Sequence, residues 1–211
     1  MEFLLAWMLI ASVQLVATMS PGPAFVMAVR YCVSYGRKAS VFLALGLGFG
    51  IAVHVVFALA GLSFIIAQSV FLYNLIKYMG AAYLVYIGIK GLRSMKSKKR
   101  QDAASQADHN QKPISSGKAI VTGFLTNVLN PKAVVFFTAV FSQFIGVDTS
   151  FSLVLLYGLT SVAIEILWFI GLAIILTNSS VKKRFMGFIH WVEGVCGGLM
   201  IALGVKLVLS K

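Results

Sequence analysis

Residues 39–67 read ASVFLALGLGFGIAVHVVFALAGLSFIIA, a run of 29 residues that contains no Lys, Arg, Asp or Glu. A helix needs about 20 mainly apolar residues to cross the hydrocarbon core of a membrane. Five further runs have a similar character, and the six predicted spans cover residues 3–29, 39–67, 70–93, 118–146, 150–177 and 186–209. These runs are much longer than the alternating segments of about 10 residues that build membrane β-barrels. The sequence therefore predicts six transmembrane helices.

The composition excludes two other classes of protein. Hydrophobic residues make up 59% of the 211 residues, charged residues make up 11%, and the mean hydropathy is +0.92. Soluble domains carry about 25% charged residues, and disordered chains are poor in hydrophobic residues. The two cysteines, Cys32 and Cys196, are too few for a disulfide framework and form no C-x-x-C motif. The expected fold class is an all-α integral membrane protein.

The formal net charge of +12 is distributed unevenly along the chain. The connections after the first, third and fifth spans hold 13 of the 18 basic residues, whereas the opposite side has only Lys206 and Lys211. Basic residues gather in cytoplasmic loops, so these connections are expected in the cytoplasm and both termini in the periplasm. This topology explains the net charge without a nucleic-acid partner. The 13 residues are Arg30, Arg37, Lys38, Arg93, Lys96, Lys98, Lys99, Arg100, Lys112, Lys118, Lys182, Lys183 and Arg184.

A polar, basic linker at residues 94–117 divides the chain into two halves, residues 1–93 and 118–211, with three predicted spans each. The halves match weakly. Ser20-Pro21-Gly22-Pro23 in the first span corresponds to Asn130-Pro131 in the fourth, at an offset of 110 residues. Because each half crosses the membrane three times, the second half enters it from the opposite side. The sequence therefore predicts two inverted three-helix repeats, an arrangement found in many secondary transporters.

The two proline motifs predict that the first and fourth helices are broken. Proline lacks an N–H and clashes with the carbonyl four residues back. A single proline often only kinks a membrane helix for packing, but two breaks at matched positions are typical of a binding site at the membrane midplane. Each break leaves free carbonyls, which suit an ammonium group, and free N–H groups, which suit a carboxylate. We therefore expect a site for a small zwitterion, such as an amino acid. Its candidate residues are Thr18, Ser20, Pro21, Gly22, Pro23, Asn127, Asn130, Pro131 and Lys132.

Three ionisable residues lie near the middle of predicted spans: His54, Lys132 and Glu165. Charged groups inside a bilayer are costly, so each of them is a candidate for a function. Glu165 and His54 are the candidates for carrying a coupling proton, because both side chains exchange protons in proteins. The alternative is a structural ion pair between Lys132 and Glu165. We find no metal-binding or catalytic motif, and we expect neither a cofactor nor an enzyme.

Three motifs carry a family resemblance: Ser20-Pro21-Gly22-Pro23, GAAYLVYIG at residues 80–88, and GFLTNVLNPK at residues 123–132. Together they resemble the LysE/RhtB family of bacterial amino-acid exporters, and the similarity covers almost the whole chain. The resemblance implies a multi-pass exporter in the bacterial inner membrane that is driven by the proton gradient. Members often have an Asp near the start of the second span, where this chain has Ile51 and then His54. Because Glu165 is the only carboxylate at depth, we expect a neutral substrate such as threonine, homoserine or leucine.

Two other functions stay open as alternatives. A heavy-metal exporter would draw on clusters of Cys, His or carboxylate ligands in its spans. A membrane thiol–disulfide relay would have cysteines beside the helix-breaking prolines, where this chain has Ser20 and Asn130. The partners expected for an amino-acid exporter are its substrate, protons, membrane lipids and, for the assembly, a second copy in a homodimer. Alternating access of the two halves is the expected mechanism.

Overall fold

The computed structural model describes residues 2–20, 22–68, 70–94, 113–144, 149–177 and 179–209. Within these ranges the chain forms eight α-helices and no strand, which confirms the all-α class. The helices are α1 (Glu2–Met19), α2 (Pro23–Ser34), α3 (Gly36–Gln68), α4 (Val70–Ser94), α6 (Ser116–Val128), α7 (Pro131–Phe144), α8 (Phe151–Leu176) and α9 (Ser179–Leu209). Most of the predicted linker, residues 95–112, lies outside the described residues, and so does Pro21.

Two of the predicted spans are interrupted at the proline motifs. The first is divided between α1 and α2, with α2 beginning at Pro23, and the fourth is divided between α6 and α7, with α7 beginning at Pro131. Each pair of helices bends by 58° at its break. In both cases a proline occupies the first position of the second helix, where its missing N–H costs no hydrogen bond. The predicted positions of both breaks are confirmed.

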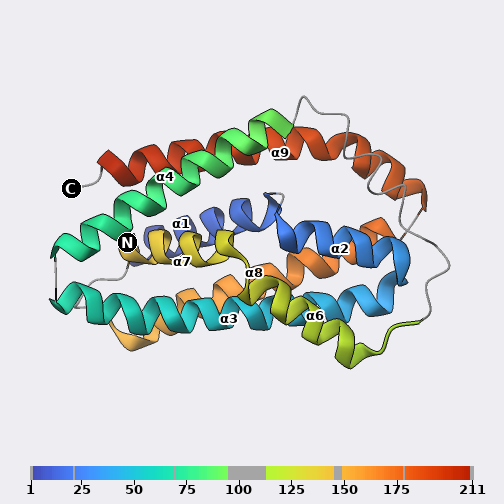
Figure 1. The fold of residues 1–211 in the computed structure, drawn as a ribbon, viewed down its shortest axis with the longest axis horizontal. Coiled ribbons are helices and arrows are strands. Elements are labelled where there is room, and N and C mark those ends of the chain that lie inside the picture. The colour runs from blue at the N-terminus through green and yellow to red at the C-terminus, as the bar shows by residue number, and fades with distance from the viewer. Residues whose placement is uncertain are drawn as a thin grey trace.

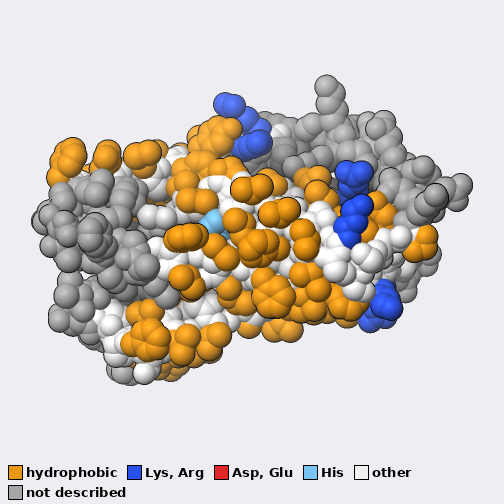
Figure 2. All heavy atoms as spheres, turned by 60° about the horizontal axis from the view of Figure 1, so that its bottom comes forward, with side chains coloured by type: hydrophobic (Ala, Val, Ile, Leu, Met, Phe, Trp, Pro, Cys, Tyr) orange, Lys and Arg blue, Asp and Glu red, His pale blue; other side chains and the backbone are white. Residues whose placement is uncertain are grey.

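Length and composition support part of the predicted membrane topology. Within the described residues, Gly36–Ala58 of α3 and Phe151–Leu176 of α8 are long and apolar enough to cross a membrane, and each bent pair passes the same test as one span. Hydrophobic side chains are spread over much of the described part of the face seen in Figure 2. Apolar surface of this extent suits contact with lipid. Membrane crossing by α4 and α9, and hence the count of six spans, stays a prediction.

In Figure 1, α4 and α9 lie above, α1, α2 and α7 lie in the middle, and α3 and α6 lie below, while α8 crosses from the lower left toward α2. Corresponding helices of the two halves run in opposite directions. α1 and α2 run away from the end that holds both termini, whereas α6 and α7 run toward it. α3 packs against α6 and α8, α1 packs against α8, and α4 packs along α9. The two broken helices also contact each other, α1 with α7 and α2 with α6.

Two glycines bring α3 and α6 into backbone contact. A Cβ atom at Gly46 would collide with the backbone of Ile120, and a Cβ atom at Gly123 would collide with the backbone of Leu43. Small residues at such crossings let membrane helices approach closely. This contact holds α6, the helix before the second break, against α3. The helix before the first break, α1, contains no glycine.

Exposed basic side chains mark one end of the bundle. Arg30, Arg37, Lys38 and Lys118 are exposed. They lie where α2 ends and where α3 and α6 begin, at the end of the molecule opposite the two termini (Figure 1). α4 runs toward the same end and has Arg93 in its last turn. The side of the membrane that this end faces stays a prediction.

Candidate functional site

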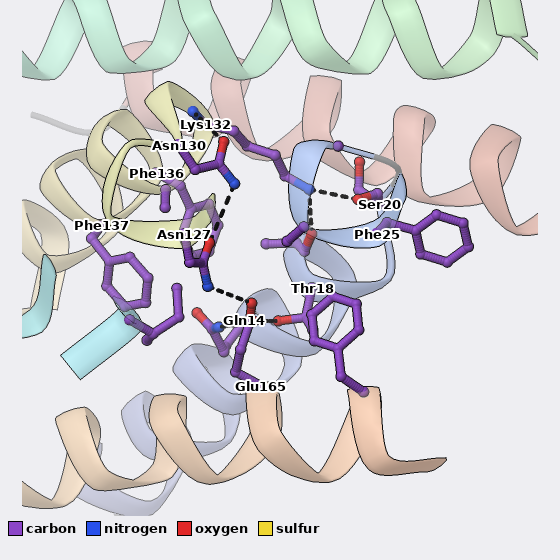
Figure 3. Close-up of a pocket in the computed structure, with 16 residues that line it drawn as sticks. Gln14, Thr18, Ser20, Phe25, Asn127, Asn130, Lys132, Phe136, Phe137 and Glu165 are labelled. Atoms are coloured by element: carbon purple, nitrogen blue, oxygen red, sulfur yellow. Dashed lines mark hydrogen bonds between the residues drawn. The ribbon is translucent and has the colours of Figure 1, made fainter. Parts of the chain in front are cut away.

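Both helix breaks border one cavity inside the bundle, which Figure 3 shows in close-up. The cavity has a volume of about 30 Å³, which is room for roughly one or two water molecules. The predicted site residues that line it are Thr18, Ser20, Gly22, Asn127, Asn130, Lys132 and Glu165. The sequence analysis missed four phenylalanines that form apolar walls, namely Phe25, Phe136, Phe137 and Phe169.

The carboxylate of Glu165 joins the two breaks. Glu165 lies on α8 and is only 4% exposed. One of its oxygens accepts hydrogen bonds from Thr18 Oγ1 at 2.6 Å and, more weakly, from Gln14 Nε2 at 3.5 Å. The other oxygen accepts a hydrogen bond from Asn127 Nδ2 at 2.9 Å. A single acidic side chain therefore binds the end of α1 on one side and the end of α6 on the other (Figure 3).

Gln14 is a site residue that the sequence analysis did not select. It is buried on α1, one turn before Thr18, and its Nε2 donates a hydrogen bond to Thr18 Oγ1 at 3.1 Å. Its Oε1 is buried without a hydrogen-bond partner in the described structure. A buried acceptor without a partner is costly, so this atom is suited to receive a donor from a ligand. The available signal in the sequence was an amide four residues before Thr18 in a mainly apolar helix.

The side chain of Lys132 crosses from the second half of the chain to the first. Its Nζ donates hydrogen bonds to the carbonyl oxygens of Ala17 at 2.7 Å and Ser20 at 2.6 Å (Figure 3). These carbonyls lie at and just beyond the C-terminal end of α1, where the last carbonyls of a helix lack their usual helical partners. The carbonyl of Ala17 also accepts a hydrogen bond from the backbone N–H of Ser20 at 3.2 Å. The lysine ammonium therefore occupies main-chain oxygens of the kind that the sequence analysis predicted to bind the ammonium group of a ligand.

The ion pair that the sequence analysis considered between Lys132 and Glu165 is not a direct contact. Among the described residues, the ammonium of Lys132 is bonded to main-chain oxygens and the carboxylate of Glu165 to neutral side chains. Lys132 and Glu165 both line the cavity, and each is bonded to other groups there. The cavity therefore has one cationic and one anionic wall with hydrogen-bonding groups between them.

The second break is held mainly by its own asparagines. Asn130 Oδ1 accepts a hydrogen bond from the backbone N–H of Lys132 at 3.1 Å, which caps the start of α7. Its Nδ2 donates to Asn127 Oδ1 at 3.3 Å. Asn127, which is 1% exposed, also donates to the carbonyl of Leu47 on α3 at 2.8 Å. The two amides therefore connect α6, α7, α3 and α8.

His54 lies behind the second break and does not line the cavity. Its Nε2 is 2.8 Å from the carbonyl oxygen of Asn127. A carbonyl only accepts hydrogen bonds, so this nitrogen is assigned the proton in the arrangement seen here. The imidazole ring stacks on Phe137, with ring centroids 6.3 Å apart. The structure therefore places His54 as a support for the backbone at the break.

Pro23 and Pro131 begin the helices that follow the two breaks and do not line the cavity. Pro23 and Pro131 are exposed residues at the starts of α2 and α7, and Pro21 is outside the described residues. Gly22 lines the cavity because the stem of Lys132 passes over it. A Cβ atom at Gly22 would lie 3.3 Å from Cδ of Lys132, which is closer than such atoms usually approach. Gly22 thus leaves space for the lysine.

The fold and the cavity together define a class of protein: a helical membrane protein with a buried polar site between two broken helices, as secondary transporters have. The model of the LysE type translocator family matches residues 15–211, and the chain belongs to this family. Within the described residues, no three potential metal ligands come together.

Several relatives resemble the chain over its full length. It is 32% identical to the threonine efflux protein of Salmonella typhi, over 99% of this chain and 100% of the relative. It is 31% identical to the threonine efflux protein of Escherichia coli (strain K12), over 99% of this chain and 100% of the relative. An uncharacterized membrane protein of Bacillus subtilis (strain 168) is 31% identical, with 100% of both chains covered. No solved structure matches the chain at a significant level.

Proposed function

We propose that this protein exports small neutral amino acids, such as threonine, across the bacterial inner membrane in exchange for protons. The observation that carries the proposal is the cavity, which places an ammonium and a carboxylate on opposite walls between two helix ends. A zwitterion needs one group of each sign in its binding site, and both groups line this cavity. Similarity to proteins named for threonine efflux supports the same substrate class.

The groups that line the cavity suggest how the amino acid binds. Its ammonium group would lie against Glu165 and donate to Gln14 Oε1, the buried acceptor that has no partner in the described structure. Its carboxylate would lie against Lys132. Because the cavity now holds about 30 Å³, its walls separate when a substrate enters. A substrate carboxylate competes with the carbonyls of Ala17 and Ser20 for the lysine, so binding weakens the contact between the two halves.

The packing of the helices supports alternating access by two inverted repeats. The contact of α6 with α3 has a counterpart in that of α1 with α8, and the contact of α2 with α8 has one in that of α7 with α3. Corresponding helices also run in opposite directions (Figure 1). Rocking of such halves about a central site exposes it to one side at a time. With the basic end in the cytoplasm, both termini are periplasmic.

Competition between the amino acid and a proton for Glu165 would couple amino-acid export to proton uptake. The ionised carboxylate attracts the ammonium group of a substrate, whereas a protonated carboxyl group does not. A proton taken up on the periplasmic side therefore displaces the amino acid, and a cytoplasmic amino acid binds when the proton has left. His54 is the second candidate for proton coupling, although it lies behind Asn127 and outside the cavity.

Flux through purified protein in proteoliposomes tests this proposal. Labelled threonine, homoserine, leucine and lysine are compared under an imposed pH gradient. We expect the neutral amino acids to move faster than lysine, and their flux to stop when a protonophore collapses the gradient. The proposal fails if no amino acid responds to the gradient. Replacement of Cys32 and Cys196 by Ser tests the thiol–disulfide alternative, because an exporter survives this change and a relay does not.

A further inference from the structure

A second hollow adjoins the central cavity. It is a groove of about 820 Å³ between α2 and the last turns of α4, with Thr126 of α6 at its side. Gly22 and Lys132 line both the groove and the central cavity, so the two spaces meet at these residues. The groove is many times larger than the cavity and has room for an amino acid.

One face of each of two helices forms the walls of the groove. α2 contributes Pro23, Val26, Met27 and Arg30, and α4 contributes Tyr83, Tyr86, Ile87, Lys90, Gly91 and Arg93. Residues spaced by three, four and seven positions share one face of a helix. Both helices run toward the basic end of the bundle (Figure 1). The groove therefore begins beside Lys132 and becomes cationic about 10 Å farther along each helix, the rise of seven residues.

Three cations face the outer part of the groove without a described acidic partner. Glu165 is the only acidic side chain that the structure describes, and it lies in the central cavity. Arg30, Lys90 and Arg93 are exposed, which leaves their donors available to a ligand. A cleft lined by one sign of charge with low-dielectric walls raises the local concentration of an oppositely charged group. Carboxylates are the anionic groups that a substrate of the proposed exporter carries.

We propose that this groove is a cytoplasmic vestibule that binds the carboxylate of the amino acid before the substrate reaches the central cavity. The inference rests on the proposed function. The order of charges supports it: Arg30, Lys90 and Arg93 come first, then Lys132 at the junction, then Glu165 in the cavity. The ammonium group of the amino acid enters the cavity first and moves toward Glu165. The carboxylate of the amino acid then moves from the groove cations to Lys132. Tyr83 and Tyr86 add hydroxyl donors along this path.

The first test measures transport kinetics in inverted membrane vesicles, which present the cytoplasmic face to labelled threonine. We expect R30Q/K90Q/R93Q to raise KM about tenfold, with kcat within about twofold, because the groove then lacks the three charges that attract the substrate carboxylate. The matched control is R37Q/K38Q/K118Q, which removes three exposed charges from the same end of the bundle but outside the groove. The vestibule is overturned if KM of the groove variant stays at the wild-type value, or if the control variant raises KM equally.

Lipid composition separates the substrate from an anionic headgroup as the ligand of these cations. The same KM comparison is repeated in proteoliposomes made only of zwitterionic lipid. A persistent difference supports binding of the substrate carboxylate. A difference that disappears in these vesicles assigns the cations to lipid headgroups and overturns the vestibule. If wild-type protein transports no amino acid at all, the proposed function fails before this comparison is reached.

The second test measures whether the groove is accessible to water and to substrate. In a background without the native cysteines, Tyr86→Cys is treated with a charged thiol reagent from the cytoplasmic face. Tyr78→Cys is the control, because both tyrosines lie on α4 and are similarly exposed, at 58% and 50%, but only Tyr86 lines the groove. We expect Tyr86→Cys to react faster than Tyr78→Cys and threonine to slow this reaction. Equal reactivity, or no effect of threonine, overturns the proposal.

Discussion

The two helix breaks bend by the same angle of 58°, but different groups hold them. At the second break, Asn130 caps α7 and bonds to Asn127, and His54 supports the carbonyl of Asn127 from α3. At the first break, Gly22 provides no side-chain cap for α2. The carbonyls of Ala17 and Ser20 accept hydrogen bonds from Lys132, which comes from the other half of the chain.

This difference shows which break can respond to a ligand. The asparagines of the second break are buried, and their amide groups are hydrogen-bonded to α3, α8 and each other. Any rearrangement of this break would have to give up these hydrogen bonds. At the first break, Glu165 contacts Thr18, and one long side chain, Lys132, bonds the carbonyls. The ammonium of Lys132 can exchange its two carbonyl partners for a substrate carboxylate. We therefore expect the second break to be the rigid element of the site and the first break to be the mobile one.

The substitution with the largest expected effect disrupts the packing of α6 against α3 behind the second break. Gly46→Ala places a methyl group against the backbone of Ile120. The clash can be relieved only if the backbones of α3 and α6 move apart. We expect a loss of about 3 kcal/mol or more, or no folded protein, because overpacking of this kind is strongly unfavourable. Thermal unfolding of the purified protein in detergent measures it.

The control for this substitution is Gly171→Ala on α8, where an added Cβ meets nothing within 4 Å. We expect it to be neutral or to stabilise α8 by up to about 1 kcal/mol, since alanine is the better helix former. If both variants unfold at the same temperature, α6 is not held by the glycine contact and the second break is less rigid than we infer.

Glu165→Gln tests the group that both breaks share. The amide keeps the shape of the side chain but cannot exchange a proton, so we expect proton-driven threonine flux to fall about 100-fold or more. Ser161→Ala, one turn earlier on α8 and outside the cavity, is the matched control and should retain flux. Wild-type flux in Glu165→Gln would remove this carboxylate from the mechanism.

Lys132→Met tests whether the first break depends on the second half. The substitution leaves the carbonyls of Ala17 and Ser20 without their donor, so we expect a loss of stability of about 1–3 kcal/mol. We also expect KM for threonine to rise about tenfold, which corresponds to the loss of about 1.4 kcal/mol of binding. Lys132→Arg keeps the charge and should restore part of both quantities. An unchanged KM in Lys132→Met would assign the lysine a purely structural role.

The substitutions with the smallest expected effects are at matched positions of the two breaks, Asn130 and Ser20. Asn130→Ala removes the cap of α7 and should destabilise the protein by about 1–2 kcal/mol. Ser20→Ala keeps the main-chain carbonyl that Lys132 contacts, so we expect a change below about 0.5 kcal/mol. Both are measured by thermal unfolding in detergent. Equal losses would show that the side chain of Ser20 contributes as much to its break as Asn130 does.

Much of the site could be predicted because its chemistry is local in the sequence. Prolines interrupt a helix within one turn, so Ser20 and Asn130 could be placed at breaks from the motifs alone. Glu165 and Lys132 stood out because charges are rare in apolar runs. Gln14 was missed because an uncharged amide is a weaker signal. The phenylalanine walls had no signal, since the chain has 16 phenylalanines and their burial depends on how each helix is rotated.

By itself, the sequence determined that this protein is helical, suited to a membrane and broken at two matched positions. Hydropathy over about 20 residues and the missing N–H of proline act without reference to the rest of the chain. Only the tertiary structure decided which groups meet. Lys132 reaches carbonyls more than 100 residues away, and Glu165 touches Thr18 and Asn127 rather than Lys132. Such contacts depend on the tilt and rotation of packed helices, which no short stretch of sequence specifies.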